Sequence, residues 1–235
     1  MEAVTVTDLP APPTPAQQLD TAEQQASEEL HAIIAAAVAA GITGAALLAI
    51  VAPLMNAVSR AAQTGWTIGT RIAMNAAVGQ RMGRNAYFAE PLPTSVEADV
   101  AAVVADAAQR VDAAHTGRPT GGVPVTPATP EVELARFQRR MVRLAVTKIH
   151  QAASAATYSY TRWLGLDLEW VTRRDGKACA VCTAMNGQRI GPGKRFTPPI
   201  GRGIPRKLWA GFQGLPPAHP SCRCRPLPRE PRPRT

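Results

Sequence analysis

The sequence has few cysteines and no segment typical of a secreted protein. Four cysteines in 235 residues are too few for a disulfide scaffold. The N-terminal stretch, MEAVTVTDLPAPPTPAQQLD, lacks the basic start and the apolar core of a signal peptide. We therefore expect a reducing interior, where thiols persist as metal ligands or as small buried side chains.

Positive charge is scarce in the first half of the chain and abundant in the second. Residues 1–130 carry 6 Lys and Arg against 11 Asp and Glu, net −5, whereas residues 131–235 carry 20 against 6, net +14. The positive charge of residues 131–235 creates an electric field that attracts polyanions, so we expect non-specific DNA binding. An acidic protein partner and a basic tail without a defined ligand are the alternatives. The arginines expected at a nucleic-acid surface are Arg139, Arg140, Arg143, Arg173, Arg174, Arg223 and Arg225.

Composition predicts a mostly α-helical chain in five segments. They are a disordered leader (1–20), an Ala-rich helical region (21–114), a linker rich in Pro, Gly and Thr (115–130), a basic module (131–228) and a basic tail (229–235). The first helix is expected to open at Asp20 or Thr21, with Glu23 in its first turn.

The stretch from Ala32 to Met55 contains no charged side chain over 24 residues, a length that can cross a bilayer. Ten of these residues are Ala, glycines and Pro53 interrupt the rest, and no aromatic belt or preceding basic cluster flanks the stretch. We therefore predict a close-packed helical hairpin that turns at Gly41 to Gly44 and again near Pro53. A membrane anchor over residues 32–55 is the alternative.

Further helices are predicted over residues 73–88, 95–114 and 131–165. The last of them is a long basic amphipathic helix, with an apolar face opposite a basic face. The apolar face contains Leu134, Phe137, Met141, Leu144, Val146 and Ile149, and the basic face contains Arg136, Arg139, Arg140, Arg143 and Lys148. The basic face is either solvated or binds in a groove. His150 is expected at the surface or boundary of this helix rather than as a ligand.

A small β-containing module is expected after Gly165. Leu168, Trp170 and Thr172 alternate as in a short strand, and residues 173–177 (RRDGK) predict a turn. Residues 187–220 are too rich in Gly and Pro to form long regular elements. We expect this stretch to fold only where another interaction holds it together.

All four cysteines lie in two short motifs, CAVC and HPSCRC. Thiolates and imidazoles are ligands of tetrahedral zinc, and two ligands separated by two residues can occupy one edge of the tetrahedron. The first choice of ligands is Cys179, Cys182, His219 and Cys222, and Cys224 can replace either of the last two. Structural zinc would stabilise this small α+β module, because metal-binding free energy becomes folding free energy in small domains. Disulfides and packed thiols are the alternatives.

We expect no enzymatic activity. A zinc hydrolase needs an open coordination position and a general base, but the region around the cysteines offers only Asp175 and Glu230 as carboxylates. His219 is the only histidine after His150, which argues against a nuclease that needs a histidine base and further metal ligands.

The two motifs together resemble the C-terminal signature of the phage head morphogenesis family, the Mu F-like minor head proteins. The stretches EWVTRRDGKACAVCTAMNGQRI and LPPAHPSCRCRPLP carry the likeness, which covers about residues 165–228. The matching residues are Trp170, Asp175, Cys179, Cys182, Gly187, His219, Pro220, Cys222, Arg223 and Cys224. Residues 1–130 carry no signature that we can assign.

The resemblance implies a low-copy virion protein, made in the bacterial cytoplasm and located in the capsid interior or at the portal vertex. The implied partners are the portal and major capsid proteins and phage DNA, and the implied role is in head assembly, DNA packaging or DNA delivery. Contact of residues 32–55 with the host membrane as DNA enters the cell is a further hypothesis. Two interpretations without a virion stay open: a zinc-stapled basic DNA-binding protein and a membrane-anchored protein.

Overall fold

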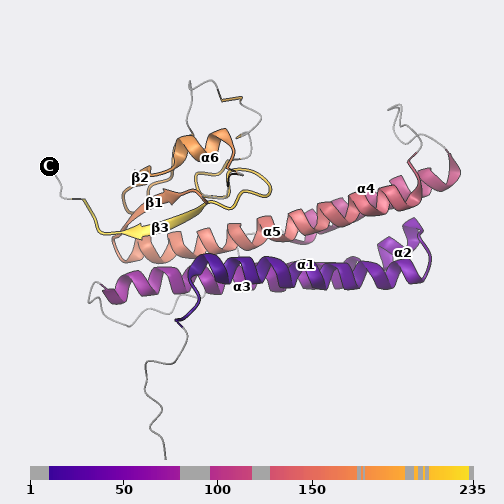
Figure 1. Ribbon diagram of the computed structural model, residues 1–235, viewed down its shortest axis with the longest axis horizontal. Helices are drawn as coiled ribbons and strands as arrows, with labels where there is room; N and C mark the ends of the chain where they lie inside the picture. The colour runs from indigo at the N-terminus through magenta and orange to yellow at the C-terminus, as the bar shows by residue number, and fades with distance from the viewer. Residues whose placement is uncertain are drawn as a thin grey trace, which may run out of the picture.

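The computed structural model of the protein describes residues 11–79, 96–117, 128–173, 176, 178–198, 204, 205, 209 and 212–232. Within these ranges the chain is mostly α-helical and carries a three-stranded antiparallel sheet (Figure 1). The predicted fold class, mostly α with a small α+β module, is therefore confirmed. Parts of the predicted leader (1–10), of one predicted helix (80–88), of the linker (118–127) and of the tail (233–235) lie outside the described residues.

The first helix, α1 (Pro15–Ala39), begins before the predicted start at Asp20, so the predicted leader is wrong from Pro15 onward. Thr14 caps this helix. Its Oγ1 accepts a hydrogen bond from the Gln17 N–H (3.3 Å), and its own N–H donates to Gln17 Oε1 (2.7 Å). This reciprocal pairing is a capping box, and proline is well tolerated in the first helical turn because its missing N–H has no partner there.

The apolar stretch over residues 32–55 is divided among three helices. The first of them, α1, ends at Ala39, Gly41 turns the chain with a φ of 112°, and the short helix α2 (Gly44–Ala49) follows. Helix α3 (Val51–Gly79) then returns alongside α1 (Figure 1). The predicted helical hairpin is confirmed.

The second turn of the hairpin lies at Ile50, just before Pro53. Pro53 falls in the first turn of α3, where the helix needs no N–H from it. In the described part of the chain, no helix is long and apolar enough to cross a membrane.

Two further helices complete a helical bundle, which we define as α1 to α5. Helix α4 (Val96–Thr116) and helix α5 (Pro130–Trp163) pack against each other, and α5 also packs against α1 and α3 (Figure 1). The main core cluster of the bundle contains Leu30, Ile34, Leu54, Val58, Val100, Phe137, Met141 and Ile149, and Trp66 of α3 packs separately with alanines of α3 and α5.

Two glycines allow α3 and α5 to approach closely. A Cβ atom on Gly65 would lie 2.2 Å from the Ile149 carbonyl oxygen, and a Cβ atom on Gly69 would lie 2.1 Å from that of Ala153. Thr157 Oγ1 donates to the Gly69 carbonyl across the same contact (3.1 Å). Only hydrogen fits at these two positions, so they set the distance between the two helices.

The basic face of α5 is narrower than predicted. Lys148 is 5% exposed and pairs with Asp99 of α4 (2.5 Å), and His150 is 3% exposed and pairs with Glu23 of α1 (2.8 Å). The predictions of Lys148 on a basic solvent face and of a surface His150 are both wrong. Because α1 and α4 cover the flanks of α5, polar side chains on those flanks become buried and acquire partners.

The Cys/His module, defined as the chain from β1 to the end of the described residues, lies against the C-terminal half of α5 (Figure 1). Its strands are β1 (Asp167–Val171), β2 (Arg189–Ile190) and β3 (Arg225–Arg229), in the order β2-β1-β3. Helix α6 (Ala180–Met185) follows β1. The predicted strand around Leu168 and Trp170 is confirmed.

Strand β3 lies at the edge of the sheet and contains two prolines. Pro226 and Pro228 stand opposite Trp170 and Leu168 of the central strand β1. Proline has no N–H for a ladder and is therefore tolerated at a sheet edge. The prediction of a basic tail from residue 229 is wrong for the described residues 229–232. Arg229 is the last residue of β3, and the Arg232 guanidinium donates a hydrogen bond to the Arg189 carbonyl (3.2 Å).

Candidate metal centre

The register of the sheet brings the two cysteine motifs together. Val171 at the end of β1 pairs with Arg225 at the start of β3, so Thr172 lies beside Cys224. Thr172 Oγ1 donates to the Cys182 carbonyl (2.7 Å) and accepts from Cys224 Sγ (3.6 Å). One threonine therefore contacts both motifs where the two strands end.

Helix α6 orients the CAVC motif. Cys179 is the N-cap of this helix, and its Sγ accepts a hydrogen bond from the Cys182 N–H (3.4 Å). At the other end of α6, Asn186 Oδ1 accepts from the Thr172 N–H (2.9 Å). With both ends held, the Sγ atoms of Cys179 and Cys182 lie 3.4 Å apart.

The HPSC turn positions the histidine. The Cys222 N–H donates to the His219 carbonyl (3.1 Å) and closes the turn. His219 Nδ1 lies 2.9 Å from the Pro220 carbonyl, so in the neutral ring Nδ1 carries the proton and Nε2 keeps its lone pair. That Nε2 faces the sulfurs, at 2.9 Å from Cys179 Sγ and 3.7 Å from Cys182 Sγ.

Cys182 is the centre of the cluster. Its Sγ also lies 3.4 Å from Cys222 Sγ. The candidate ligands form two groups that share this residue, Cys179–Cys182–His219 and Cys182–Cys222–Cys224, and within each group the ligand atoms lie within 4.8 Å of one another. All five predicted ligand residues are thus brought together, and either group can hold a metal ion.

All four cysteines are free, with no disulfide among them. Hydrogen bonds with Cys182 and Cys224 lower the pKa of Cys222 to about 2. The same bond to Cys222, then that to Cys224, and burial raise the pKa of Cys182. The contact with Cys182 lowers the pKa of Cys224, but the contact with Cys222 and burial outweigh it and raise this pKa to about 12. Neighbouring S–H groups therefore stabilise a thiolate, a task that a bound cation performs in metal sites.

The spacing of the donors fits a metal with thiolate and imidazole ligands. Zinc–sulfur bonds of about 2.3 Å place tetrahedral sulfurs about 3.8 Å apart. The Sγ atom of Cys182 lies 3.4 Å from the Sγ atoms of Cys179 and Cys222, which is close to that edge length. The cluster can therefore hold a metal ion without large movement around Cys182.

The sulfurs also form part of the interior of the Cys/His module. Cys182, Cys222 and Cys224 are 2 to 3% exposed and pack in one cluster with Trp170 and Met185. The Trp170 ring makes edge contacts with Phe196 and Phe212, at centroid distances of 5.4 and 5.8 Å. Three of the five candidate ligands are thus core residues of the module, whereas Cys179 and His219 are half-buried.

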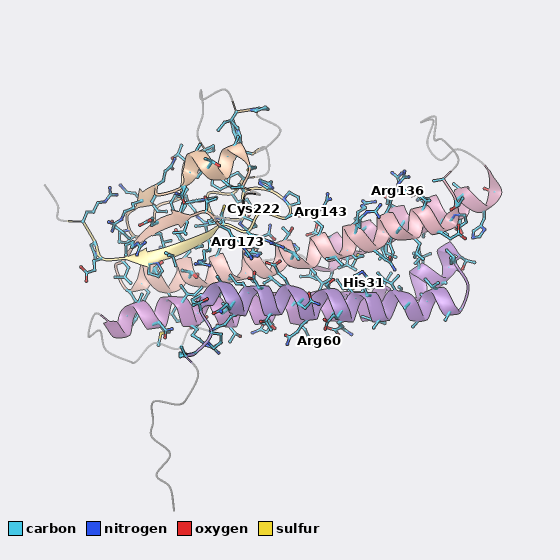
Figure 2. All side chains as sticks on the ribbon, in the orientation of Figure 1. His31, Arg60, Arg136, Arg143, Arg173 and Cys222 are labelled. Atoms are coloured by element: carbon cyan, nitrogen blue, oxygen red, sulfur yellow. The ribbon has the colours of Figure 1, made fainter. Side chains whose placement is uncertain are left out.

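The loop from His219 to Cys224, which we call the metal-site loop, also contacts the bundle. Figure 2 shows Cys222 of this loop above α5. Glu23 of α1 is 8% exposed and receives hydrogen bonds from His150 Nε2 (2.8 Å) and the Arg223 guanidinium (3.1 Å). The Ser221 N–H donates to Thr147 Oγ1 of α5 (3.3 Å). These contacts join α1, α5 and the HPSCRC motif.

The arginines predicted at a nucleic-acid surface divide into two sets. Arg173 pairs with Asp20 (3.1 Å for one of its two bonds) and Arg223 with Glu23, so both bridge to α1. Burial lowers the pKa of the half-buried Arg225, and repulsion from Arg173 adds to it. Arg174 lies outside the described residues, as does Asp175 of the family signature.

The other set lies on α5. Arg139, Arg140 and Arg143 line a groove between α4 and α5. Arg140 pairs there with Asp106. The groove also contains Arg110 and Arg136, which we did not predict as nucleic-acid contacts.

Sequence reasoning missed Thr147, and it named Asp20 and Glu23 only as the start and a first-turn acid of the predicted first helix, not as partners of arginine or histidine side chains. Glu23 meets His150 across 127 positions of the chain. No local pattern signals such a contact, because it arises only when α1 packs against α5.

Comparison of the chain with models of protein families, with curated proteins and with solved structures gave no match. The resemblance to the phage head morphogenesis family therefore stays a prediction that rests on the two motifs.

Proposed function

We propose that the chain is a minor head protein of a tailed bacteriophage, located in the capsid interior or at the portal vertex, with a Cys/His module stapled by structural zinc. Its partners would be the portal and major capsid proteins. The observation that carries the proposal is that CAVC and HPSCRC, the two halves of the family signature, meet in one cluster around the buried Cys182. A structural role is favoured because Cys182 and Cys222 are also core residues of the module, while Cys179 and His219 are half-buried beside them.

The donor set favours zinc over calcium or magnesium. Sulfur and imidazole are ligands of zinc, whereas calcium and magnesium take oxygen ligands. Among the described residues, neither group of candidate ligands contains a carboxylate. The hydrogen bond from His219 Nδ1 to a backbone carbonyl is the second contact that zinc-binding histidines commonly make.

The fourth ligand is Cys222 rather than Cys224. Cys179, Cys182 and His219 form one complete group, and Cys222 Sγ lies 3.4 Å from the shared Cys182. The Sγ atom of Cys224 has a further contact, since it also donates to Thr172 Oγ1 (3.6 Å).

The test of the zinc site is the metal content of the full-length protein by elemental mass spectrometry. We expect one zinc per chain, retained in Cys224→Ser and lost in Cys222→Ser. These two variants make the same change at adjacent, equally buried sulfurs, so each controls for the other. A folded wild-type protein without metal would refute the zinc staple, and retention in Cys222→Ser with loss in Cys224→Ser would refute the ligand set.

The test of the head-protein role is the composition of purified particles. Quantitative mass spectrometry of virions from the phage that encodes this chain should find it at a few copies per particle. A deletion should reduce the yield of filled, infectious heads. Absence from particles while the protein accumulates in infected cells would contradict the role and support a zinc-stapled DNA-binding protein outside the virion.

A further inference from the structure

A strongly basic groove runs between α4 and α5, on a surface that the metal centre does not use. It has a volume of about 410 Å³. Two carboxylates and five arginines line it, and we call it the arginine groove after Arg110, Arg136, Arg139, Arg140 and Arg143.

Each of the two carboxylates of the groove already pairs with at least one arginine. Asp106 accepts from Arg110 (3.1 Å) and from Arg140, and Glu133 accepts from Arg136. Five arginines against two carboxylates leave a net charge of +3.

Two arginines of the groove keep their full hydrogen-bonding capacity. Arg139 and Arg143 are exposed, and no carboxylate pairs with either of them within the described ranges. Each guanidinium can therefore donate two parallel hydrogen bonds to an anion. Such forks match the oxygens of a phosphate group.

The groove has the length of a backbone site. From Arg136 to Arg143 the α-helix rises about 10 Å, which is about three phosphate steps along one DNA strand. Figure 2 shows these two arginines along the α4–α5 side of the molecule, with Arg60 on the opposite edge.

The groove also leads towards the metal-site loop. Thr147, one turn after Arg143, donates to the Arg143 carbonyl (2.7 Å) and accepts from the Ser221 N–H (3.3 Å). Arg143 therefore lies one helical turn from the contact between α5 and the loop that carries Arg223.

Among the described residues, no base-stacking platform lines the arginine groove. The one aromatic residue in its described lining, Phe137, is 1% exposed and belongs to the bundle core. Proteins that hold single strands stack the bases on exposed aromatic rings. A groove of exposed guanidinium groups without such rings suits a duplex, whose bases are already stacked.

We propose that the arginine groove binds the phosphate backbone of duplex DNA without reading its sequence. Arg139 and Arg143 make the direct phosphate contacts, and Arg110, Arg136 and Arg140 supply the positive field. The proposal does not depend on the head-protein role, because it concerns a property of the isolated chain. Presence in virions without duplex binding would refute this proposal alone.

The test is fluorescence anisotropy of a labelled random-sequence duplex with the zinc-loaded full-length protein, over a range of salt concentrations. We expect the Arg139→Gln/Arg143→Gln double variant to bind at least tenfold more weakly. The slope of log affinity against log salt should fall by about 1.8, since each phosphate contact contributes about 0.9.

The matched control is Arg60→Gln/Arg71→Gln, which removes two exposed charges from α3. This control should change affinity less than twofold, and the melting curves of both variants should match that of the wild type. Equal weakening in the two double variants, or no duplex binding at low salt, would overturn the proposal. Equal or tighter binding of a single strand would overturn it as well. So would equal competition by polyglutamate, which would identify an acidic protein as the partner.

Discussion

The helical bundle buries aliphatic side chains from several helices, whereas the Cys/His module buries three cysteines among nine described core residues of its own, which pack with Tyr158 of α5. In the bundle, α5 is the longest described helix and packs against α1, α3 and α4. Packed apolar side chains exclude water there. In the module, short strands and one helix of six residues enclose an interior that is part aromatic and part sulfur.

This contrast indicates two ways of stabilising structure within one chain. Burial of apolar area stabilises the bundle, at roughly 25 cal/mol per Å². The module has little such area, so we expect a metal ion at its sulfurs to supply part of its stability. The two regions should therefore respond differently to the same perturbation.

Metal removal should have the largest effect and should separate the two regions. Structural zinc contributes about 10 kcal/mol or more in small zinc modules, so a strong chelator should unfold β1, α6 and β3 while α1 and α3 stay folded. Hydrogen exchange measured by mass spectrometry should show full loss of protection over residues 167–171 and 225–229. Restoring zinc to the same sample is the control. Unchanged protection in the metal-free protein would show that the packed aromatic rings suffice.

Breaking the buried link between the regions should have the next largest effect. Glu23→Ala leaves His150 buried without its acceptor and removes the partner of Arg223. Removing one partner of a buried pair costs about 3 to 5 kcal/mol, and we expect a value near 3 because the Arg223 side chain is 37% exposed. Urea denaturation followed by helical circular dichroism measures the change.

Glu29→Ala is the matched control for Glu23→Ala. It makes the same substitution on the same helix, but its partner is the exposed Arg60, so the expected cost is below about 1 kcal/mol. Equal losses in the two variants would mean that burial of Glu23 adds nothing to the link.

Crowding the contact between α3 and α5 should disturb the bundle directly. The methyl group of Gly65→Ala would meet the Ile149 backbone at 2.2 Å, which only a shift of one helix can relieve. Overpacking of this kind costs about 1 to 3 kcal/mol. Gly191→Ala, where the nearest atom is 4.0 Å away, is the control and should change the free energy of unfolding by less than about 0.5 kcal/mol. A silent Gly65→Ala would show that the two helices separate freely.

The sequence predicts local features of this fold well. The gap between apolar helices at Gly41, the strand at Trp170 and the five candidate ligands all follow from short patterns, and the structure has each of them. The start of α1 was also readable, because Thr14, Pro15 and Gln17 form a standard helix cap. Counting prolines towards a disordered leader hid that signal.

Contacts between distant helices could not be predicted in this way. Lys148 and His150 follow the polar side of a single amphipathic helix, yet α1 and α4 bury both. Gly65 and Gly69 have the spacing of a close helix contact, but the sequence does not say which helix approaches them. The arginine groove depends on the same packing, since Arg110 and Arg136 come from different helices.

Acid should produce the smallest of these differences in stability between the bundle and the Cys/His module. Burial tends to raise the pKa of Asp106, but hydrogen bonds from Arg140 and Arg110 outweigh it and hold this pKa below its usual 3.8. Its stabilising effect is therefore complete above the unfolded pKa and is lost as the pH falls through the lower, folded pKa.

In urea denaturation, Asp106→Asn should therefore cost the bundle less than about 1 kcal/mol at pH 7, since a half-exposed ion pair is screened by water. The difference from the wild type should shrink below about pH 4.

Protons also compete with metal for thiolates, so the module should lose its zinc over the same acid range and unfold first. The substitution Asp106→Asn also removes a negative charge from the arginine groove, so it should tighten duplex binding. If the bundle instead unfolded before the module on acidification, the bundle would be the region whose stability depends more on titratable groups.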